Sequence, residues 1–244
     1  MGRIGLVVVI LSLVGTQEIY SDILDTPYMA AIFWLQDGIY QFHCNGAIIS
    51  SRHVLTTATC AMYPVGLRNM MVRVGSSNHL YGGQERFVDN VYQHFKFSPD
   101  LDSDIAVLKL NEPLKLSHRI ALVNLPEEDL FVAFPSVTYY GFERFSGWSF
   151  DTLKQSKLLN YPMNNSQCNL YFHGHSENKY YLVTENMICG QPNPYPDIRI
   201  FGAPLVYDGT IYGLCSWVHK VNYDAPLIFT RVAAFTDWIK NWIR

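Results

Sequence analysis

The chain has 244 residues, of which 49% are hydrophobic and 16% are charged, and its 18 basic and 21 acidic residues give a net charge of −3. This length is enough for one large β-rich or mixed domain, or for two smaller domains, and the apolar content excludes general disorder. No block of like charges is present in the sequence. A binding surface for nucleic acid or for an anionic membrane is therefore not expected.

The N-terminus has the pattern of a secretory signal. Arg3 precedes a largely apolar run from Ile4 to Val14, and small or polar residues follow. Such a run is too short to span a bilayer, whereas a basic head, a short apolar body and a small-residue end are typical of signal peptides. We expect residues 1–16 to be a signal peptide and residues 17–244 to form a secreted, extracellular domain without a membrane span. The alternative is a buried N-terminal strand.

Short runs of β-type residues recur behind this segment, about ten residues apart, which is typical of a β-sandwich or β-barrel. The pair Asp208-Gly209 between two apolar runs indicates a hairpin. Only the last stretch has a helical period, and its apolar face would consist of Phe235, Trp238, Ile239, Trp242 and Ile243. We expect one all-β unit that ends in a C-terminal α-helix. Its strands are expected to include residues 28–35, 47–50, 70–75, 105–110, 136–140, 205–207 and 211–218.

Three groups of motifs follow one another along the chain. The first combines Cys44–Ser50 (CNGAIIS) with Val54–Cys60 (VLTTATC), the second is Asp102–Leu110 (DSDIAVLKL), and the third combines Gly202–Val206 (GAPLV) with Gly213–Trp217 (GLCSW). In this order, and followed by the C-terminal helix, they resemble the trypsin/chymotrypsin family of secreted serine proteases. The resemblance spans nearly the whole mature chain. It implies a double six-stranded antiparallel β-barrel with a cleft between the barrels.

Catalysis in this family requires a histidine as general base, an aspartate that orients it, a serine nucleophile, and backbone N–H groups that hold the oxyanion. The resemblance places Thr59, Asp104 and Phe201 at the three triad positions, and Arg199 at the glycine of the oxyanion hole. A threonine hydroxyl is no general base near neutral pH. We expect Asp104 to be a structural carboxylate that accepts hydrogen bonds from backbone N–H groups and from Ser216, with the Thr59 hydroxyl as a further donor.

The family's activation signal is also altered. Proteolytic activation in this family frees an ammonium that pairs with an aspartate beside the nucleophile. Here Ile23 lies roughly where the new N-terminus would begin, Asp22 replaces the basic residue before it, and Ile200 occupies the position of the partner aspartate. Because one unpaired buried charge is strongly destabilising, losing both partners is less harmful than losing one. We expect no activation by proteolysis.

The same resemblance implies how the five cysteines pair. It pairs Cys44 with Cys60 and Cys168 with Cys189, as suits an oxidising compartment. A third bridge of the family would join Asp197 to the region 221–224, and neither end has a cysteine. Cys215 is left over within an apolar strand. We expect it to be a small core residue rather than a reactive thiol.

Three further features bear on function. Asn164 opens the sequon Asn-Asn-Ser, so a secreted chain is expected to carry a glycan there. His173 and His175 flank a glycine without the other ligands of a recognised metal site, so we expect a solvated loop and neither metal nor cofactor. Tyr195 falls at the base of the family's specificity pocket, where it leaves little room for a substrate side chain.

These departures favour a secreted, non-catalytic serine protease homologue with a degenerate triad, which is not an enzyme and acts by binding a protein partner. Candidate partners are a protease, an inhibitor or a receptor. The first alternative is an active secreted serine-type endopeptidase-like hydrolase with a displaced nucleophile, which requires another Ser, Thr or Cys within reach of a base. The second alternative is a carrier of a small ligand.

Overall fold

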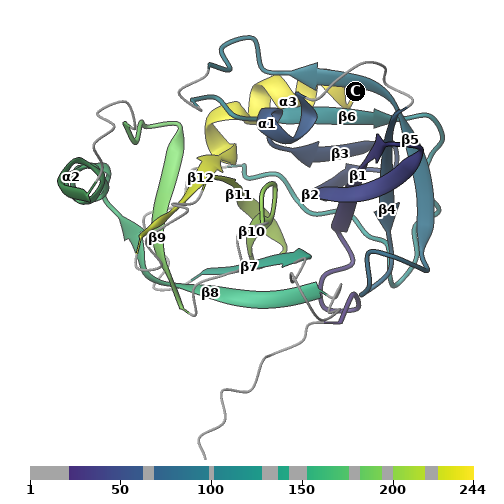
Figure 1. The fold of residues 1–244 in the computed structure, drawn as a ribbon, viewed down its shortest axis with the longest axis horizontal. Helices are drawn as coiled ribbons and strands as arrows, with labels where there is room; N and C mark the ends of the chain where they lie inside the picture. Colours follow the sequence, from purple (N-terminus) through teal and green to yellow (C-terminus); the bar gives the residue numbers. More distant parts are fainter. Residues whose placement is uncertain are drawn as a thin grey trace, which may run out of the picture.

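The computed structural model describes residues 22–62, 69–98, 102–127, 137–142, 153–175, 182–193, 200–217 and 225–244. The strands in these ranges form two closed antiparallel barrels of six strands each (Figure 1). In the first barrel the strands are ordered β1-β2-β3-β6-β5-β4, and in the second β10-β11-β12-β9-β8-β7. The expected double barrel with a C-terminal helix is therefore confirmed.

The elements have the following bounds. The first barrel consists of β1 (Met29–Gln36), β2 (Ile39–Ser50), β3 (His53–Thr56), β4 (Met70–Val74), β5 (Gln84–Gln93) and β6 (Ala106–Leu110). The second consists of β7 (Val137–Phe142), β8 (Leu153–Met163), β9 (Met187–Asn193), β10 (Pro204–Tyr207), β11 (Thr210–Trp217) and β12 (Leu227–Arg231). The helices are α1 (Ala58–Ala61), α2 (Asn165–His175), the 3₁₀ turn η3 (Val232–Phe235) and α3 (Thr236–Trp242).

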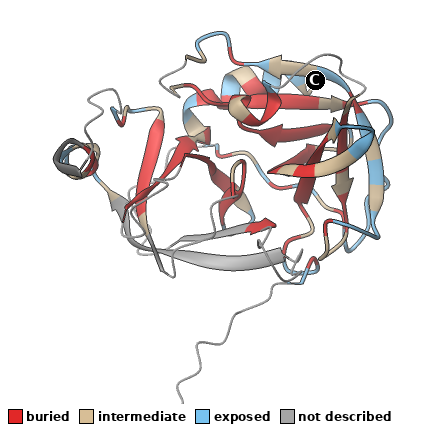
Figure 2. Cartoon of the chain, in the orientation of Figure 1, coloured by how far each residue is buried: buried red, intermediate tan, exposed pale blue. Residues whose placement is uncertain are grey.

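Alternation along the strands separates two parts of the core. In β1, Ile32 and Trp34 pack in the cluster of the first barrel, whereas Ala31 and Phe33 point to a second cluster. This second cluster joins both barrels and α3, since it also contains residues such as Ile239 of α3. Figure 2 shows how buried residues line the first barrel and the strands β10, β11 and β12. The core thus continues across the junction between the barrels and fixes their relative position.

Strand β5 and helix α2 are two of the elements that the sequence did not predict. Strand β5 alternates exposed and half-buried residues with few apolar side chains, so its pattern is weak. Helix α2 has the sequence NSQCNLYFHGH, which lacks the apolar period of an amphipathic helix. Its position is fixed instead by the disulfide Cys168–Cys189 to β9 and by packing of Phe172 against Trp217. Among the described residues, no helix has the length and apolar content needed to cross a membrane.

Candidate functional site

Asp104 lies where the two barrels meet. Its Oδ1 accepts a hydrogen bond from the backbone N–H of Thr59 (2.7 Å), which belongs to the first barrel. Its Oδ2 accepts one from the Ser216 hydroxyl (2.6 Å), on β11 of the second barrel. The carbonyl oxygen of Asp104 accepts a third from the Thr230 hydroxyl on β12 (2.7 Å). One buried residue is thus bonded to three elements, which makes it a structural link between the barrels.

The surroundings of the carboxylate have opposing electrostatic effects. Burial raises the pKa of Asp104 above its ordinary value, and the hydrogen bonds from Ser216 and from the Thr59 amide counteract that rise. The Thr59 hydroxyl meets the expectation of a further donor only in part: its side chain is a smaller cause that lowers the pKa of Asp104, but it makes no hydrogen bond of standard geometry. The reason is local geometry: Thr59 lies in the short helix α1, whose first turn directs the main-chain amide, rather than the hydroxyl, at the carboxylate.

Phe201 fills the space between the barrels with a hydrocarbon ring. The side chain is partly buried and packs against the core of the first barrel and against that of the second. Its carbonyl oxygen accepts hydrogen bonds from the backbone N–H of Asn45 (2.8 Å) and from Asn45 Nδ2 (3.4 Å). Phe201 therefore offers apolar packing and a main-chain acceptor, and it has no group that could attack a carbonyl carbon.

Asn45 is a functional-site residue that sequence reasoning missed. It is fully buried on β2, and its side chain bonds across to β7: Oδ1 accepts from the Phe142 N–H (2.7 Å) and Nδ2 donates to the Phe142 carbonyl (3.4 Å). Its own carbonyl accepts from the Thr56 hydroxyl (2.8 Å). The available signal was the motif CNGAIIS, in which Asn45 stands where the family's motif has glycine.

The backbone at Gly202 passes very close to Asn45. Gly202 has φ +74°, in the left-handed region, and its N–H donates to the Cys215 carbonyl (2.7 Å). A Cβ at this position would lie 2.0 Å from the Asn45 carbonyl oxygen and 2.7 Å from Thr56 Oγ1. Only glycine fits here, so the loop that carries Phe201 is held against the first barrel by main-chain contact.

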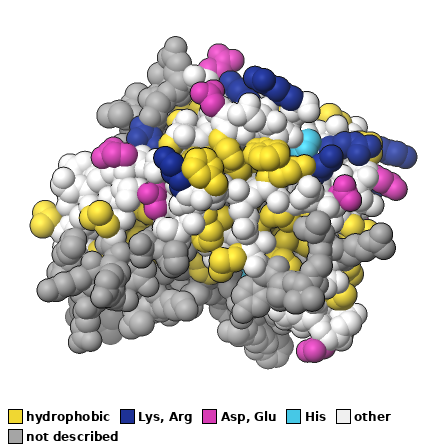
Figure 3. Space-filling view, turned by 90° about the horizontal axis from the view of Figure 1, so that it is seen from above, with side chains coloured by type: hydrophobic (Ala, Val, Ile, Leu, Met, Phe, Trp, Pro, Cys, Tyr) yellow, Lys and Arg dark blue, Asp and Glu magenta, His cyan; other side chains and the backbone are white. Residues whose placement is uncertain are grey.

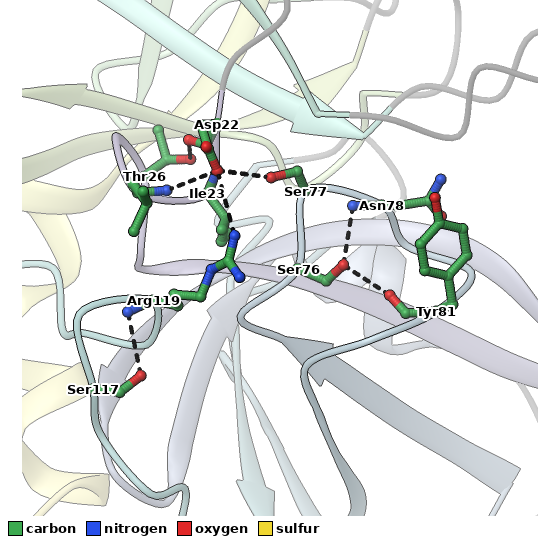
Figure 4. Close-up of polar contacts among 10 residues, drawn as sticks. Asp22, Ile23, Thr26, Ser76, Ser77, Asn78, Tyr81, Ser117 and Arg119 are labelled. Carbon is green, nitrogen blue, oxygen red and sulfur yellow. Dashed lines mark hydrogen bonds and ion pairs between the residues drawn. The ribbon is translucent and has the colours of Figure 1, made fainter.

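The segment around Ile23 is anchored without a terminal ammonium (Figure 4). Ile23 is fully buried, and its amide N–H donates to the Ser77 hydroxyl (3.0 Å). Ser77 in turn donates to the Asp22 carboxylate (3.0 Å), and the Arg119 guanidinium lies 4.0 Å from the same oxygen. The Ser77 hydroxyl, followed by the Leu24 amide, holds the pKa of Asp22 below its ordinary value.

The position expected for the partner aspartate holds no charge. Ile200 is buried in the apolar cluster of the second barrel, together with Leu205 and Phe229. The anchor of Ile23 is provided by Ser77 instead, which the sequence alone did not identify because Ser77 is distant from every recognised motif. In the described chain, an apolar residue thus occupies the position of the partner aspartate, and the Ile23 amide is bonded to a hydroxyl.

The cysteines pair as the resemblance implied. Cys44 is bonded to Cys60, and Cys168 is bonded to Cys189. Cys215 is a buried free thiol in the second barrel, and burial raises its pKa well above the ordinary value, with the nearby Asp104 charge as a smaller cause. Because the thiolate is the nucleophilic form, Cys215 is inert at neutral pH.

Several predicted positions are not described. Arg199, Tyr195, Asp197 and the region 221–224 lie outside the described residues, as do residues 1–16. The expectation of a loop at His173 and His175 is wrong, because the backbone of both residues belongs to helix α2, although their side chains are not described. Within the described part of the chain, no group of three or more His, Cys, Asp or Glu could hold a metal ion.

Comparison with known proteins decides the family. The family model described as Trypsin matches residues 14–239. The chain belongs to the trypsin family. This trypsin-family chain is 30% identical over 233 residues to Trypsin 5G1 of Aedes aegypti, covering 89% of the chain and 80% of the relative. It is also 30% identical over 236 residues to Chymotrypsin-C of Mus musculus, covering 89% and 84%.

Solved structures support the fold of this trypsin-family protein. A scabies mite inactivated protease paralogue, S-D1, superposes with a TM-score of 0.79 at 21% identity, over 93% of the chain and 96% of its own. A second scabies mite inactivated protease paralogue, S-I1, has a TM-score of 0.77 at 24% identity, over 92% and 98%. At these sequence identities the superpositions establish the double-barrel fold alone. The role of the residues between the barrels has to be argued from their contacts in this chain.

Proposed function

We propose that this trypsin-family protein is secreted, lacks peptidase activity and acts by binding another protein, with Thr59, Asp104 and Phe201 at the positions of a degenerate triad. The observation that carries the proposal is the set of contacts at Asp104. Both carboxylate oxygens accept hydrogen bonds, one from a backbone amide and one from a hydroxyl, and neither donor is an imidazole. Acyl transfer in this family needs a base beside the nucleophile.

The alternative of a displaced nucleophile finds little support among the described groups near Asp104. The Ser216 hydroxyl is buried and donates a hydrogen bond to the Asp104 carboxylate, and among the described residues no imidazole is bonded to it. Cys215 is a buried neutral thiol. Thr59 is buried as a hydroxyl without a hydrogen-bond partner and therefore without a base. These groups suit a stable junction between barrels better than a catalytic centre.

The proposal predicts no covalent labelling by an activity probe. We expect the purified protein, incubated with a fluorophosphonate, to show labelling below about one thousandth of that of an active trypsin-family enzyme, because triad function is lost at two of its members. Phe201→Ser is expected to be equally unlabelled, since Thr59 still supplies no base. Stoichiometric labelling of either protein at a single Ser, Thr or Cys, retained after denaturation and mapped by mass spectrometry, would establish the active-hydrolase alternative.

Secretion and glycosylation form a second prediction. The two disulfides are consistent with an oxidising compartment. Asn164 is exposed, and its Oδ1 caps α2 by accepting from the Gln167 N–H (2.8 Å). A glycan on Nδ2 leaves this acceptor in place, so the cap and the modification are compatible.

Expression of the full chain in a eukaryotic secretory host is therefore expected to give medium-borne protein that has lost about the first sixteen residues, as signal peptides of this length are removed. Digestion with a peptide N-glycosidase should reduce its mass by one glycan. Asn164→Gln and Ser166→Ala should both abolish that mass change. Retention of residues 1–16 in the mature protein, or a mass unaffected by the glycosidase, would contradict the respective part of the prediction.

A further inference from the structure

A row of aromatic side chains runs along the face formed by the end of β5 and by α3. Tyr92 stacks on Trp242, with ring centroids 4.0 Å apart and planes at 14°. His94 contacts Trp238 edge-on (5.1 Å between centroids) and lies 4.8 Å from Phe95. We call Tyr92, His94, Phe95, Trp238 and Trp242 the aromatic row. Ring contacts within the row hold its members in fixed orientations, so their surface is preformed.

Apart from the buried His94, the members of the row are open to solvent. Phe95 is 80% exposed and Trp242 is 40% exposed, while Tyr92 and Trp238 are partly exposed. Figure 3, which views the molecule from above Figure 1, shows a band of hydrophobic side chains across the middle, with Lys and Arg side chains near both ends and Asp and Glu side chains close to these. Contiguous exposed apolar patches are typical of interaction sites, and aromatic residues are enriched at protein–protein interfaces.

One end of the row carries Lys96. Its ammonium nitrogen lies 5.8 Å from the centroid of the Phe95 ring, and its side chain is exposed. The nearby acidic residue Asp102 makes no ion pair with Lys96 among the described residues, and one of its oxygens accepts hydrogen bonds from the Ser103 amide, Asn186 Nδ2 and Thr184 Oγ1. Lys96 therefore has an ammonium available to a ligand.

The other end carries Lys109 and Arg52. Strand pairing sets Lys109 of β6 opposite His53 of β3, and it sets Val107, two residues before Lys109, opposite Tyr92. Residues two apart on a strand face the same way, so Lys109 lies on the same side of the sheet as Tyr92. Burial, followed by the charges of Lys109 and Arg52, lowers the pKa of His53, which places both cations beside it.

Within the described ranges, which leave out residues 99–101, none of these three cations makes an ion pair. Among the described residues the ion pairs are Arg73–Glu85 and Arg119–Asp22, both elsewhere in the first barrel. Asp89 of β5 and Asp237 of α3 accordingly make no ion pair with Lys96, Lys109 or Arg52. A chain of net charge −3 thus presents a rigid aromatic surface between two unpaired basic ends.

We propose that the aromatic row is a docking surface for an acidic segment of a partner protein that also carries apolar or aromatic side chains. The proposal deepens the proposed function by naming the chemistry of the protein partner. Carboxylates at both ends of the bound segment pair with Lys96 and with Lys109 and Arg52, and its apolar side chains cover Phe95 and the Tyr92–Trp242 stack. Charge complementarity selects the segment and sets its rate of association, and the aromatic contacts supply most of the affinity.

The test uses a random copolymer of L-glutamate and L-tyrosine as the probe, labelled with a fluorophore and followed by anisotropy in dilute buffer. The glycosylated full-length protein is expected to bind it several-fold more tightly than it binds poly-L-glutamate, because the homopolymer lacks rings to stack. Arg52→Glu combined with Lys96→Glu is expected to weaken binding at least tenfold. Phe95→Ala, a truncation of an exposed ring, is expected to weaken it about threefold to tenfold.

The matched control reverses two charges away from the row. Lys115 is exposed on a loop, and Lys240 lies on the other side of α3 in a groove with Ile49 and Leu122. Lys115→Glu combined with Lys240→Glu should change binding less than twofold. Equal losses in the two double variants would overturn the proposal, because they would report net charge alone.

Two further probes separate other ligand classes. Dextran sulfate and vesicles containing phosphatidylserine should bind more weakly than the copolymer, and their binding should not respond to Phe95→Ala. Absence of copolymer binding, or preferential binding of either other probe at this face, would overturn the proposal. The fluorophosphonate experiment does not depend on the copolymer result. The proposed lack of peptidase activity and the proposed docking surface are therefore tested separately.

Discussion

Replacement of Gly202 by alanine is expected to prevent stable folding. The new Cβ would lie 2.0 Å from the carbonyl oxygen of Asn45, at a φ of +74° that alanine itself disfavours. That oxygen cannot retreat easily, because it accepts from the Thr56 hydroxyl while the Asn45 side chain is bonded to Phe142 on the second barrel. We expect a loss above about 4 kcal/mol, a large part of the stability of an ordinary domain.

Gly38→Ala provides the matched control. Gly38 has φ +80°, and a Cβ there would meet nothing within 4 Å, so this variant bears the left-handed backbone cost without a clash. We expect it to lose about 1–2 kcal/mol, and hence roughly 2–8 °C in melting temperature. Urea unfolding and thermal melts of both variants measure the difference. A Gly202→Ala protein that melts within a few degrees of Gly38→Ala would show that residue 202 does not lie against Asn45.

Asp104→Ala is expected to lower the free energy of unfolding by about 2–3 kcal/mol, because it leaves the buried Thr59 N–H and Ser216 hydroxyl without their acceptor. Asp104→Asn is expected to stay within about 1 kcal/mol of the unaltered protein near neutral pH. Its Oδ1 can accept from Thr59, its amide group can donate to the Ser216 oxygen, and no charge is then buried. Asp104→Asn keeps a hydrogen-bonding group and removes the charge, whereas Asp104→Ala removes both. Comparing the two variants therefore shows whether the protein needs the hydrogen bonds of Asp104 or also its negative charge.

The pH dependence gives a second readout of the same pair. Burial raises the folded-state pKa of Asp104 above its ordinary value of 3.8, so the folded protein binds this proton more tightly than the unfolded chain. Its contribution to stability is therefore fully present below pH 3.8 and is lost as the pH rises through the folded-state pKa. Asp104→Asn should consequently gain stability relative to the unaltered protein as the pH rises through that range. If Asp104→Asn is instead as unstable as Asp104→Ala at neutral pH, the negative charge of Asp104 is needed and must have a partner. That result would support the active-hydrolase alternative.

The sequence was sufficient for the architecture, because the motifs around Cys44, Asp102 and Gly213 are local and keep their order. It was also sufficient for both disulfides and for the hydrogen bond from Ser216 to Asp104. The role of Asn45 was not predictable, although its substitution was visible. Its partner Phe142 is 97 residues away along the chain, and only the folded barrels bring the two together.

Thr59 illustrates a different limit. Its side chain was expected to donate to Asp104, whereas the hydrogen bond of standard geometry comes from its main chain. Residue type indicates which groups are available, whereas the direction of a donor depends on backbone geometry that a motif does not record. The same reasoning applies to Ser77, an ordinary polar residue by sequence that is the hydrogen-bond partner of the Ile23 amide.

The hydrogen bond at Ile23 also differs from an ammonium anchor in what it requires to form. A chain-terminal ammonium titrates at about pH 8, so an anchor built on one would weaken in mildly alkaline fluid and would first have to be created by a cut. An amide N–H bonded to Ser77 has no charge to lose and needs no cut to exist. This hydrogen bond forms in the uncleaved chain, so the contact between Ile23 and Ser77 does not depend on a cut before Ile23.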